Sequence, residues 1–143
     1  IPLDIFATAL NIEDDSIRAD MANAVCNVMF KANILTESLI QSQLFITMMN
    51  HFVSDAYVIQ TRILNAFSLL YQNISPRNLH LFINQEFFQT LEGLIETDSP
   101  DIERIGHEIF TYVKIDGSVL NEEIDAIVEE FGEFLLMRSL EST

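Results

Sequence analysis

Two stretches of this chain carry the same pattern of apolar residues 43 positions apart: LIQSQLFITMMNHFVSDAYVIQTRILNAFSLL (residues 39–70) and FINQEFFQTLEGLIETDSPDIERIGHEIFTYV (residues 82–113). Moved back by 42 positions, residues 59–70 also align with residues 17–28. A period of 42–43 residues with helical spacing throughout is typical of solenoids built from stacked helical repeats. The repeat therefore predicts an all-α fold, a right-handed α-solenoid of about three repeats. The aligned pairs include Phe45 with Phe88, Ile59 with Ile102, and Phe67 with Phe110.

Apolar spacing and helix-start signals divide the chain into helices. Apolar residues three to four positions apart predict the buried stripe of a long helix, and they are Ile17, Met21, Ala24, Val25 and Val28. Ser99-Pro100 is a strong start signal, because serine caps a helix and proline fits its first position. No segment shows the alternation of apolar and polar residues that would predict a β-strand instead. Two further helices are predicted to start at Thr36 and at Ser75-Pro76, and the first of these breaks near Gln43. The other predicted helices cover residues 3–10, 16–31, 57–72, 101–113 and 122–140.

The composition predicts one folded domain over residues 1–143. Hydrophobic residues make up 49% of the chain, and 11 Phe supply bulk for a core. No low-complexity linker interrupts the sequence, whose start without Met suggests a fragment of a longer protein. Gly106 lies inside a helical stretch, where glycine costs about 1 kcal/mol relative to alanine. Its presence there predicts close packing or curvature of the helix. A compact helical bundle is the alternative fold, since 143 residues hold few repeats.

The net charge of −15, from 22 acidic and 7 basic residues, limits the partners. Nucleic acid and anionic membrane surfaces are excluded, because both require clustered Lys and Arg. A basic protein or peptide would be attracted, although the charge could also serve solubility alone. The single cysteine, Cys26, fits a reducing compartment, the cytoplasm or the nucleus. No run approaches the roughly 20 apolar residues that span a bilayer.

No group of residues predicts catalysis or a cofactor. Cys26 has no histidine or other base within a helical turn, which favours a small core residue. His51, His80 and His107 are widely separated and do not match metal-ligand spacing. Adjacent carboxylates on a helix diverge and cannot form an acid–base pair. We therefore expect no enzyme, no metal and no cofactor.

The segments over residues 3–113 resemble the armadillo and HEAT-repeat superfamily. In that superfamily, a short polar turn precedes a third helix with an apolar–small pattern. The matching turns in this chain are Ser54-Asp55 and Thr97–Pro100. The resemblance implies an α-solenoid that binds other proteins. The third helices here contain Ala19–Val28, Thr61–Leu70 and Arg104–Val113.

Within that superfamily we compare the chain with importin-alpha, whose groove uses a Trp and an Asn four residues apart on each third helix. The chain has no Trp, and only Asn27 matches. The sequence is thus more similar to the C-terminal repeats of such a protein, which lack the regular Trp and Asn positions and bind other proteins. The Trp-like positions hold Asn23, Asn65 and Glu108, and the Asn-like positions hold Asn27, Leu69 and Tyr112.

These observations predict a protein–protein interaction scaffold, of the nuclear-transport adaptor kind that the resemblance implies. A basic or amphipathic segment of a partner would lie along the face formed by the third helices. The alternative is a structural module in which the apolar ends, residues 3–10 and 131–140, pair two copies as a homodimer. The residues predicted to line the binding face are Asn23, Asn27, Asn65, Ser68, Glu108, Thr111 and Tyr112.

Overall fold

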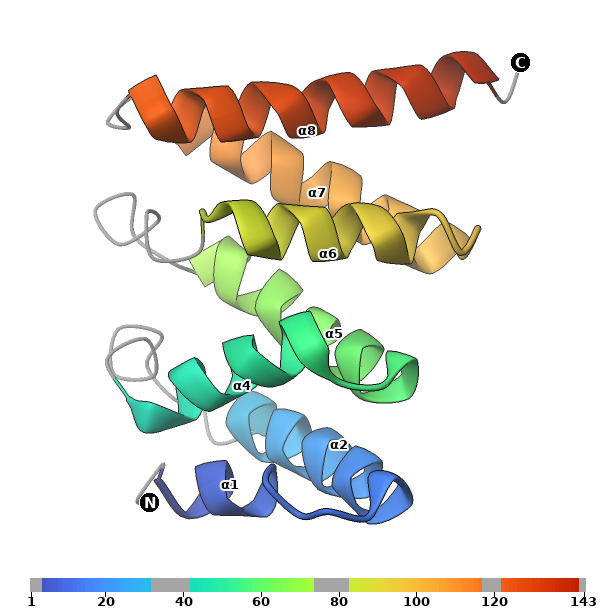
Figure 1. Cartoon of the computed structure of the whole chain (residues 1–143). Helices are drawn as coiled ribbons and strands as arrows, with labels where there is room; N and C mark the ends of the chain where they lie inside the picture. The colour runs from blue at the N-terminus through green and yellow to red at the C-terminus, as the bar shows by residue number, and fades with distance from the viewer. Residues whose placement is uncertain (1–3, 32–41, 74–82, 117–121, 142–143) are drawn as a thin grey trace. The chain divides into compact units, whose positions relative to one another are not determined.

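The structure, a computed structural model, is all-helical wherever it is described. It describes residues 4–31, 42–73, 83–116 and 122–141, and these ranges contain seven helices and no strand (Figure 1). The predicted all-α class is confirmed for these residues. They belong to two compact units, Ile1–Asn73 and Ile74–Thr143.

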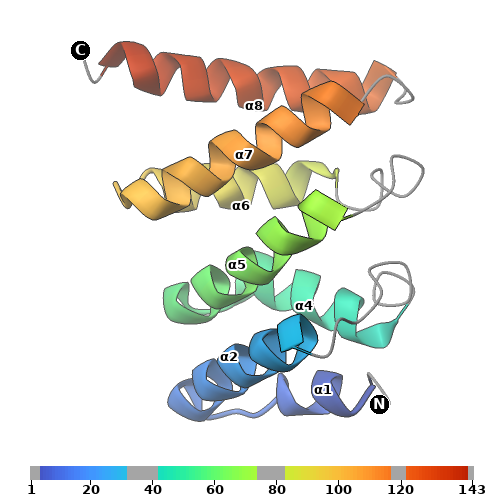
Figure 2. The same cartoon turned by 180° about the vertical axis from the view of Figure 1, so that it is seen from behind.

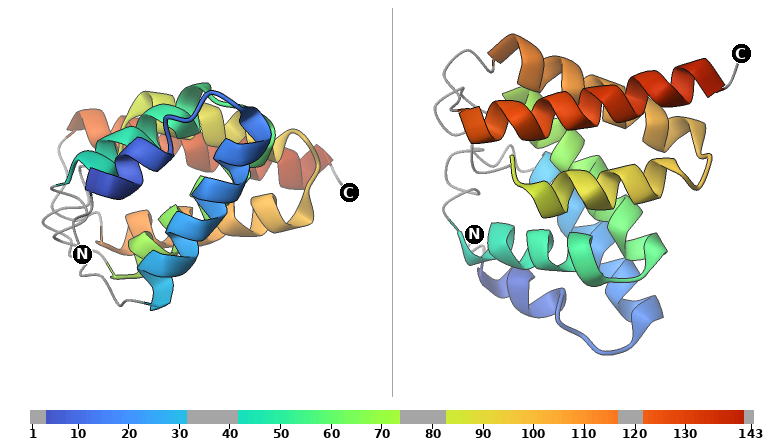
Figure 3. Two further views of the ribbon diagram at one scale, coloured as in Figure 1. Left: turned by 90° about the horizontal axis from the view of Figure 1, so that it is seen from below. Right: turned by 45° about the horizontal axis from the view of Figure 1, so that its top comes forward.

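In residues 4–31 and 42–73, the first unit contains four helices in two layers. They are α1 (Asp4–Ala9), α2 (Asp15–Lys31), α4 (Gln43–Ser54) and α5 (Tyr57–Asn73). Helices α1 and α4 contact each other on one side, while α2 and α5 contact each other on the other (Figures 2 and 3). Helix α4 also packs on α5, and this contact joins the two layers.

Aromatic side chains fill the space between α4 and α5. The Phe67 ring lies 5.9 Å from the Phe45 ring and 5.6 Å from the Phe52 ring, centroid to centroid. Both distances are in the range of favourable aromatic pairs. Tyr71 of α5 is also buried, and burial raises the pKa of its hydroxyl well above the ordinary value. Phe45, Phe52 and Phe67 are therefore core positions of the first unit.

The second unit contains α6 (Gln85–Ile95), α7 (Pro100–Asp116) and α8 (Glu122–Glu141), each in contact with the other two. The helices approach closely at two glycines. A Cβ atom added at Gly106 would lie 2.7 Å from Ile95 Cδ1, and one added at Gly132 would lie 2.8 Å from Phe110 Cζ. The close packing predicted at Gly106 is confirmed.

The turn between α6 and α7 is held by charged groups. Asp98 adopts a left-handed backbone conformation with φ of 64°, which aspartate tolerates better than most residues. Arg138 of α8 donates from Nη2 to Asp98 Oδ1 at 2.9 Å and from Nε to Glu103 Oε1 at 3.4 Å. The next helix begins at Pro100, as the start signal predicted, and Ser99 Oγ accepts from the Ile102 N–H at 3.5 Å.

One part of the predicted stripe of α2 is wrong. Ile17 is 47% exposed and Ala24 is also exposed, whereas Arg18, predicted on no buried face, is 9% exposed. Ala22 and Val25 complete the buried side. Arg18 can take this place because its guanidinium group is paired with the carboxylates of Asp55 and Asp15. The predicted starts at Thr36 and Ser75-Pro76 lie outside the described residues, as do residues 1–3 and 142–143.

Candidate protein-binding surface

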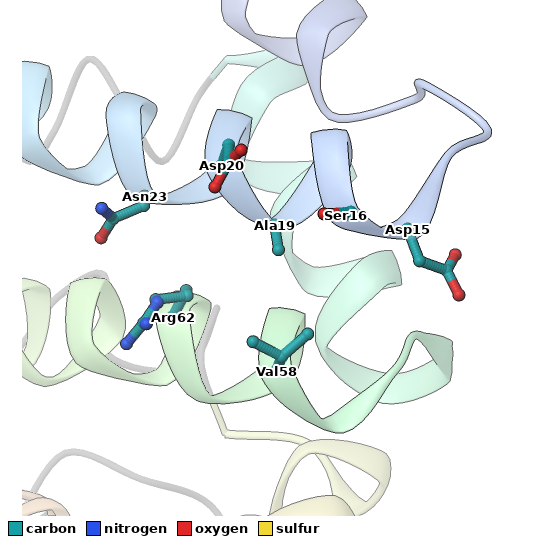
Figure 4. Close-up of a pocket in the computed structure, with 7 residues that line it drawn as sticks. All are labelled: Asp15, Ser16, Ala19, Asp20, Asn23, Val58 and Arg62. Atoms are coloured by element: carbon teal, nitrogen blue, oxygen red, sulfur yellow. The ribbon is translucent and has the colours of Figure 1, made fainter.

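The exposed side of α2 and α5 contains a groove. It has a volume of about 430 Å³ and lies where the two helices pack side by side (Figure 4). Ala19 of α2 and Val58 of α5 face one another across it. The remaining lining residues are Asp15, Ser16, Asp20, Asn23 and Arg62.

Four of the predicted binding residues lie on these two helices. Asn23 and Asn27 on α2 and Asn65 on α5 are exposed, and Ser68 on α5 is half-buried. Asn23 and Asn65 hold equivalent positions of the repeat, 42 residues apart. The structure places Asn23 in the groove itself. No residue of this group is buried, so all four side chains are accessible to a ligand.

The other three predicted residues lie on α7, in the second unit. Glu108 is half-buried, and its carboxylate Oε1 accepts from Arg104 Nη1 at 2.9 Å. Thr111 is exposed, and its hydroxyl donates to the backbone carbonyl of His107 at 2.9 Å. Tyr112 is half-buried. These residues occupy one helix, and the described contacts do not bring them to the groove of α2 and α5.

A buried ionic network supports the end of the groove. Arg18 donates to both carboxylate oxygens of Asp55, from Nε at 2.8 Å and from Nη2 at 2.7 Å. Its guanidinium group also donates to Asp15 Oδ1 and to the backbone carbonyls of Ile12 and Glu13. This bidentate arrangement is the strongest form of arginine–carboxylate pairing. The network joins the turn before α2 to the turn before α5, and so fixes the two helices that form the groove.

His51 extends this network without forming a catalytic centre. Its Nδ1 lies 2.6 Å from Asp55 Oδ2, and its Nε2 lies 3.0 Å from Asn11 Oδ1. A histidine that acts as a base needs a nucleophile or substrate at its second nitrogen. Here Asn11 occupies that position, so the arrangement ties α4 to the turn before α2. His51 lies in the last turn of α4, from which it reaches both partners.

The pKa of Asp55 predicts a pH dependence of stability. Burial raises this pKa, but hydrogen bonds from Arg18, the Ala56 N–H and His51 outweigh burial and lower it to about 2. The carboxylate therefore contributes stability above its unfolded pKa, 3.8, and loses this contribution as the pH falls through about 2. The lost contribution should be about 2 kcal/mol.

The measurement compares urea unfolding of the wild type and Asp55→Asn between pH 7 and pH 2. We expect the stability advantage of the wild type to be constant above pH 5 and to shrink below pH 4. An advantage that stayed unchanged down to pH 2 would contradict the role given to the Asp55 carboxylate.

Several residues of the surface were not predicted from the sequence. Val58 and Arg62 follow the same exposed stripe of α5 as Asn65, at spacings of four and three residues. Ser16 and Asp20 are their equivalents on α2, 42 residues earlier. The signal that could have identified them is this repeat spacing.

In comparisons with protein-family models, curated proteins and solved structures, no match to this chain was found. Within the described ranges, no three His, Cys, Asp or Glu side chains are grouped as ligands for a metal ion. None of the helices in the same ranges is long and apolar enough to cross a membrane. The surface of α2 and α5 is therefore interpreted from its own chemistry.

Proposed function

We propose that the chain is a protein–protein interaction scaffold, and that a basic or amphipathic segment of a partner lies along the exposed side of α2 and α5. The observation that carries the proposal is the pair of adjacent helices with exposed amides, Asn23 and Asn65, at equivalent repeat positions beside a groove. In this proposal the helices are third helices of successive armadillo-like repeats in a right-handed α-solenoid. Its place in the cell is the cytoplasm or the nucleus.

The amide side chains suit an extended peptide. Each asparagine offers donors and an acceptor, and an extended backbone presents N–H and C=O groups in alternation. Two amides on neighbouring helices can therefore hold two points of one bound chain. Ala19 and Val58 leave space between them for the backbone.

The charges around the groove favour a partner segment that contains Lys or Arg and that offers a hydrogen-bond acceptor to Arg62. Asp15 and Asp20 are exposed at the groove and attract Lys or Arg side chains. Arg62 lies on the α5 side, where it can donate to a backbone carbonyl of the bound segment. Because the groove carries both acidic residues and one arginine, we expect it to bind a basic segment with moderate affinity that weakens as the salt concentration rises.

A binding measurement tests the proposal with an extended, fluorescently labelled Lys-rich peptide. The Asn23→Ala/Asn65→Ala double variant should bind about tenfold or more weakly, because two hydrogen bonds of about 1 kcal/mol each are lost. Asn50→Ala is the matched control, since Asn50 is equally exposed on α4, away from the groove. Unchanged binding by the double variant, or an equal loss in the control, would contradict the proposal.

Pairing of two copies through the apolar ends is the second candidate. This pairing is favoured by two exposed apolar side chains, since Ile5 on α1 is 63% exposed and Leu140 on α8 is 60% exposed. Light scattering of the purified chain distinguishes the two candidates. A monomeric mass that does not change with concentration supports the scaffold, and a dimer that dissociates on dilution supports pairing.

A further inference from the structure

Helix α8 has two opposite faces of different character. Val128, Phe131 and Leu135 are buried against the rest of the second unit. Positions half a helical turn away from them form one continuous exposed stripe. From the start of α8 to its end, this outer stripe contains Glu122, Glu129, Glu133, Leu136, Met137 and Leu140.

The first part of the stripe is strongly acidic. All seven carboxylate residues of α8 are exposed, and its one basic residue, Arg138, is directed to Asp98 and Glu103. The crowding of charge extends to α6, where burial and then the charges of Glu130 and Glu96 raise the pKa of Glu92. Of the 22 acidic residues of the chain, 15 lie in residues 74–143, with only 4 basic ones. Within its described residues, α8 therefore carries seven carboxylates and one guanidinium group, and its surface is strongly negative.

The last part of the stripe is apolar. Leu136 is 58% exposed, Met137 55% and Leu140 60%. Three large apolar side chains within two turns of one helix leave a contiguous surface whose burial would be favourable. Methionine adds a flexible side chain that adapts to differing partners. The outer stripe therefore carries charge at one end and apolar surface at the other.

We propose that the outer stripe of α8 binds an amphipathic helix of a protein partner, with apolar residues in its N-terminal turns and Lys or Arg in its C-terminal turns. Charge complementarity selects this partner, because only a basic segment matches the carboxylates beside the apolar end. The orientation is antiparallel. Basic residues at the C-terminal end of the partner helix also stabilise that helix through its own dipole.

A second copy of this chain matches the stripe less well. In an antiparallel pair of α8 helices, the apolar end of each would face carboxylates of the other. In a parallel pair, the carboxylates Glu129 and Glu133 would face their own counterparts. Both arrangements place charges where they repel or lose water without compensation.

The probe is a fluorescently labelled alanine-based peptide of about 20 residues, matching the length of α8 of about 30 Å. Leucines occupy one face of its first turns, and lysines occupy the same face of its last turns. A peptide of equal composition with the leucines and lysines interleaved is the control ligand. Anisotropy titrations with the full chain at about 0.05 M and about 0.15 M salt give the affinities.

The variants separate the two parts of the stripe. Met137→Ser/Leu140→Ser should weaken binding about tenfold at both salt concentrations, because apolar burial is insensitive to screening. Glu129→Gln/Glu133→Gln should weaken it about tenfold at low salt and less at high salt. Ile46→Ser and Glu86→Gln change equally exposed residues on other helices and should leave the affinity unchanged. Circular dichroism confirms that the exposed substitutions preserve the fold.

Three results would overturn the proposal. One is equal binding of the segregated and interleaved peptides, and another is wild-type affinity in both double variants. The third is a dimeric mass in light scattering that Met137→Ser/Leu140→Ser converts to a monomer, since a second copy would then cover the stripe. A loss confined to Asn23→Ala/Asn65→Ala would assign the peptide to the groove of α2 and α5 instead.

Discussion

Replacing Arg18 with methionine should lower the free energy of unfolding by about 3–5 kcal/mol, the usual cost of removing one partner of a buried ion pair. The Asp55 side chain is 7% exposed and would lose both hydrogen bonds from the guanidinium group. Methionine approximately fills the space of the arginine stem, so the loss comes from the stranded carboxylate. Urea unfolding monitored by circular dichroism measures it.

Two further variants make this prediction specific. Arg104→Met breaks an ion pair with Glu108 that is 59% and 39% exposed, and should cost no more than about 1 kcal/mol. Adding Asp55→Asn to Arg18→Met removes the stranded charge and should recover part of the stability. If Arg18→Met cost no more than Arg104→Met, the network would not be what fixes the turns before α2 and α5.

Replacing Phe131 with alanine should destabilise the second unit by about 3–5 kcal/mol, as expected for a large aromatic residue in a core. Phe131 is fully buried, and its ring lies 4.8 Å from Phe88 of α6 and 6.2 Å from Phe110 of α7. It therefore joins α8 to both α6 and α7. Thermal or urea unfolding provides the measurement.

Leu136→Ala is the matched control for Phe131→Ala on the same helix. Leu136 is 58% exposed, and its truncation should change the unfolding free energy by no more than about 0.5 kcal/mol. Comparable losses in the two variants would show that α8 is not packed through the face that contains Phe131.

The helices of this chain could be predicted from the sequence because their signals are local. Ser99-Pro100 marks the start of α7, and the apolar spacing of residues 57–72 corresponds to α5, Tyr57–Asn73. The buried side of α2 was partly misassigned, since a pattern based on apolarity ranks Ile17 above Arg18. Burial of Arg18 depends on Asp55, 37 residues away, and that pairing leaves no local signal.

The sequence predicted only those residues of the proposed binding surface that occupy equivalent positions in successive repeats. Asn23 and Asn65 follow from their equivalence across 42 residues. Arg62 and Val58 were not predicted because they lie outside the positions that the resembling family uses for binding, although they belong to the same exposed stripe of α5 as Asn65. Nothing in the linear sequence indicates that Ala19 and Val58 face one another, since this depends on how α2 and α5 pack.

The central claim, that the exposed side of α2 and α5 holds a basic peptide segment, is tested most directly by NMR. The ¹⁵N-labelled chain is titrated with the Lys-rich peptide, and the side-chain amide signals of Asn23, Asn27 and Asn65 are followed. The proposal predicts saturable shifts of these signals together with backbone shifts along the groove, while the signal of Asn50 stays in place. Shifts confined to other helices, or no saturable shift of Asn23 and Asn65, would contradict it.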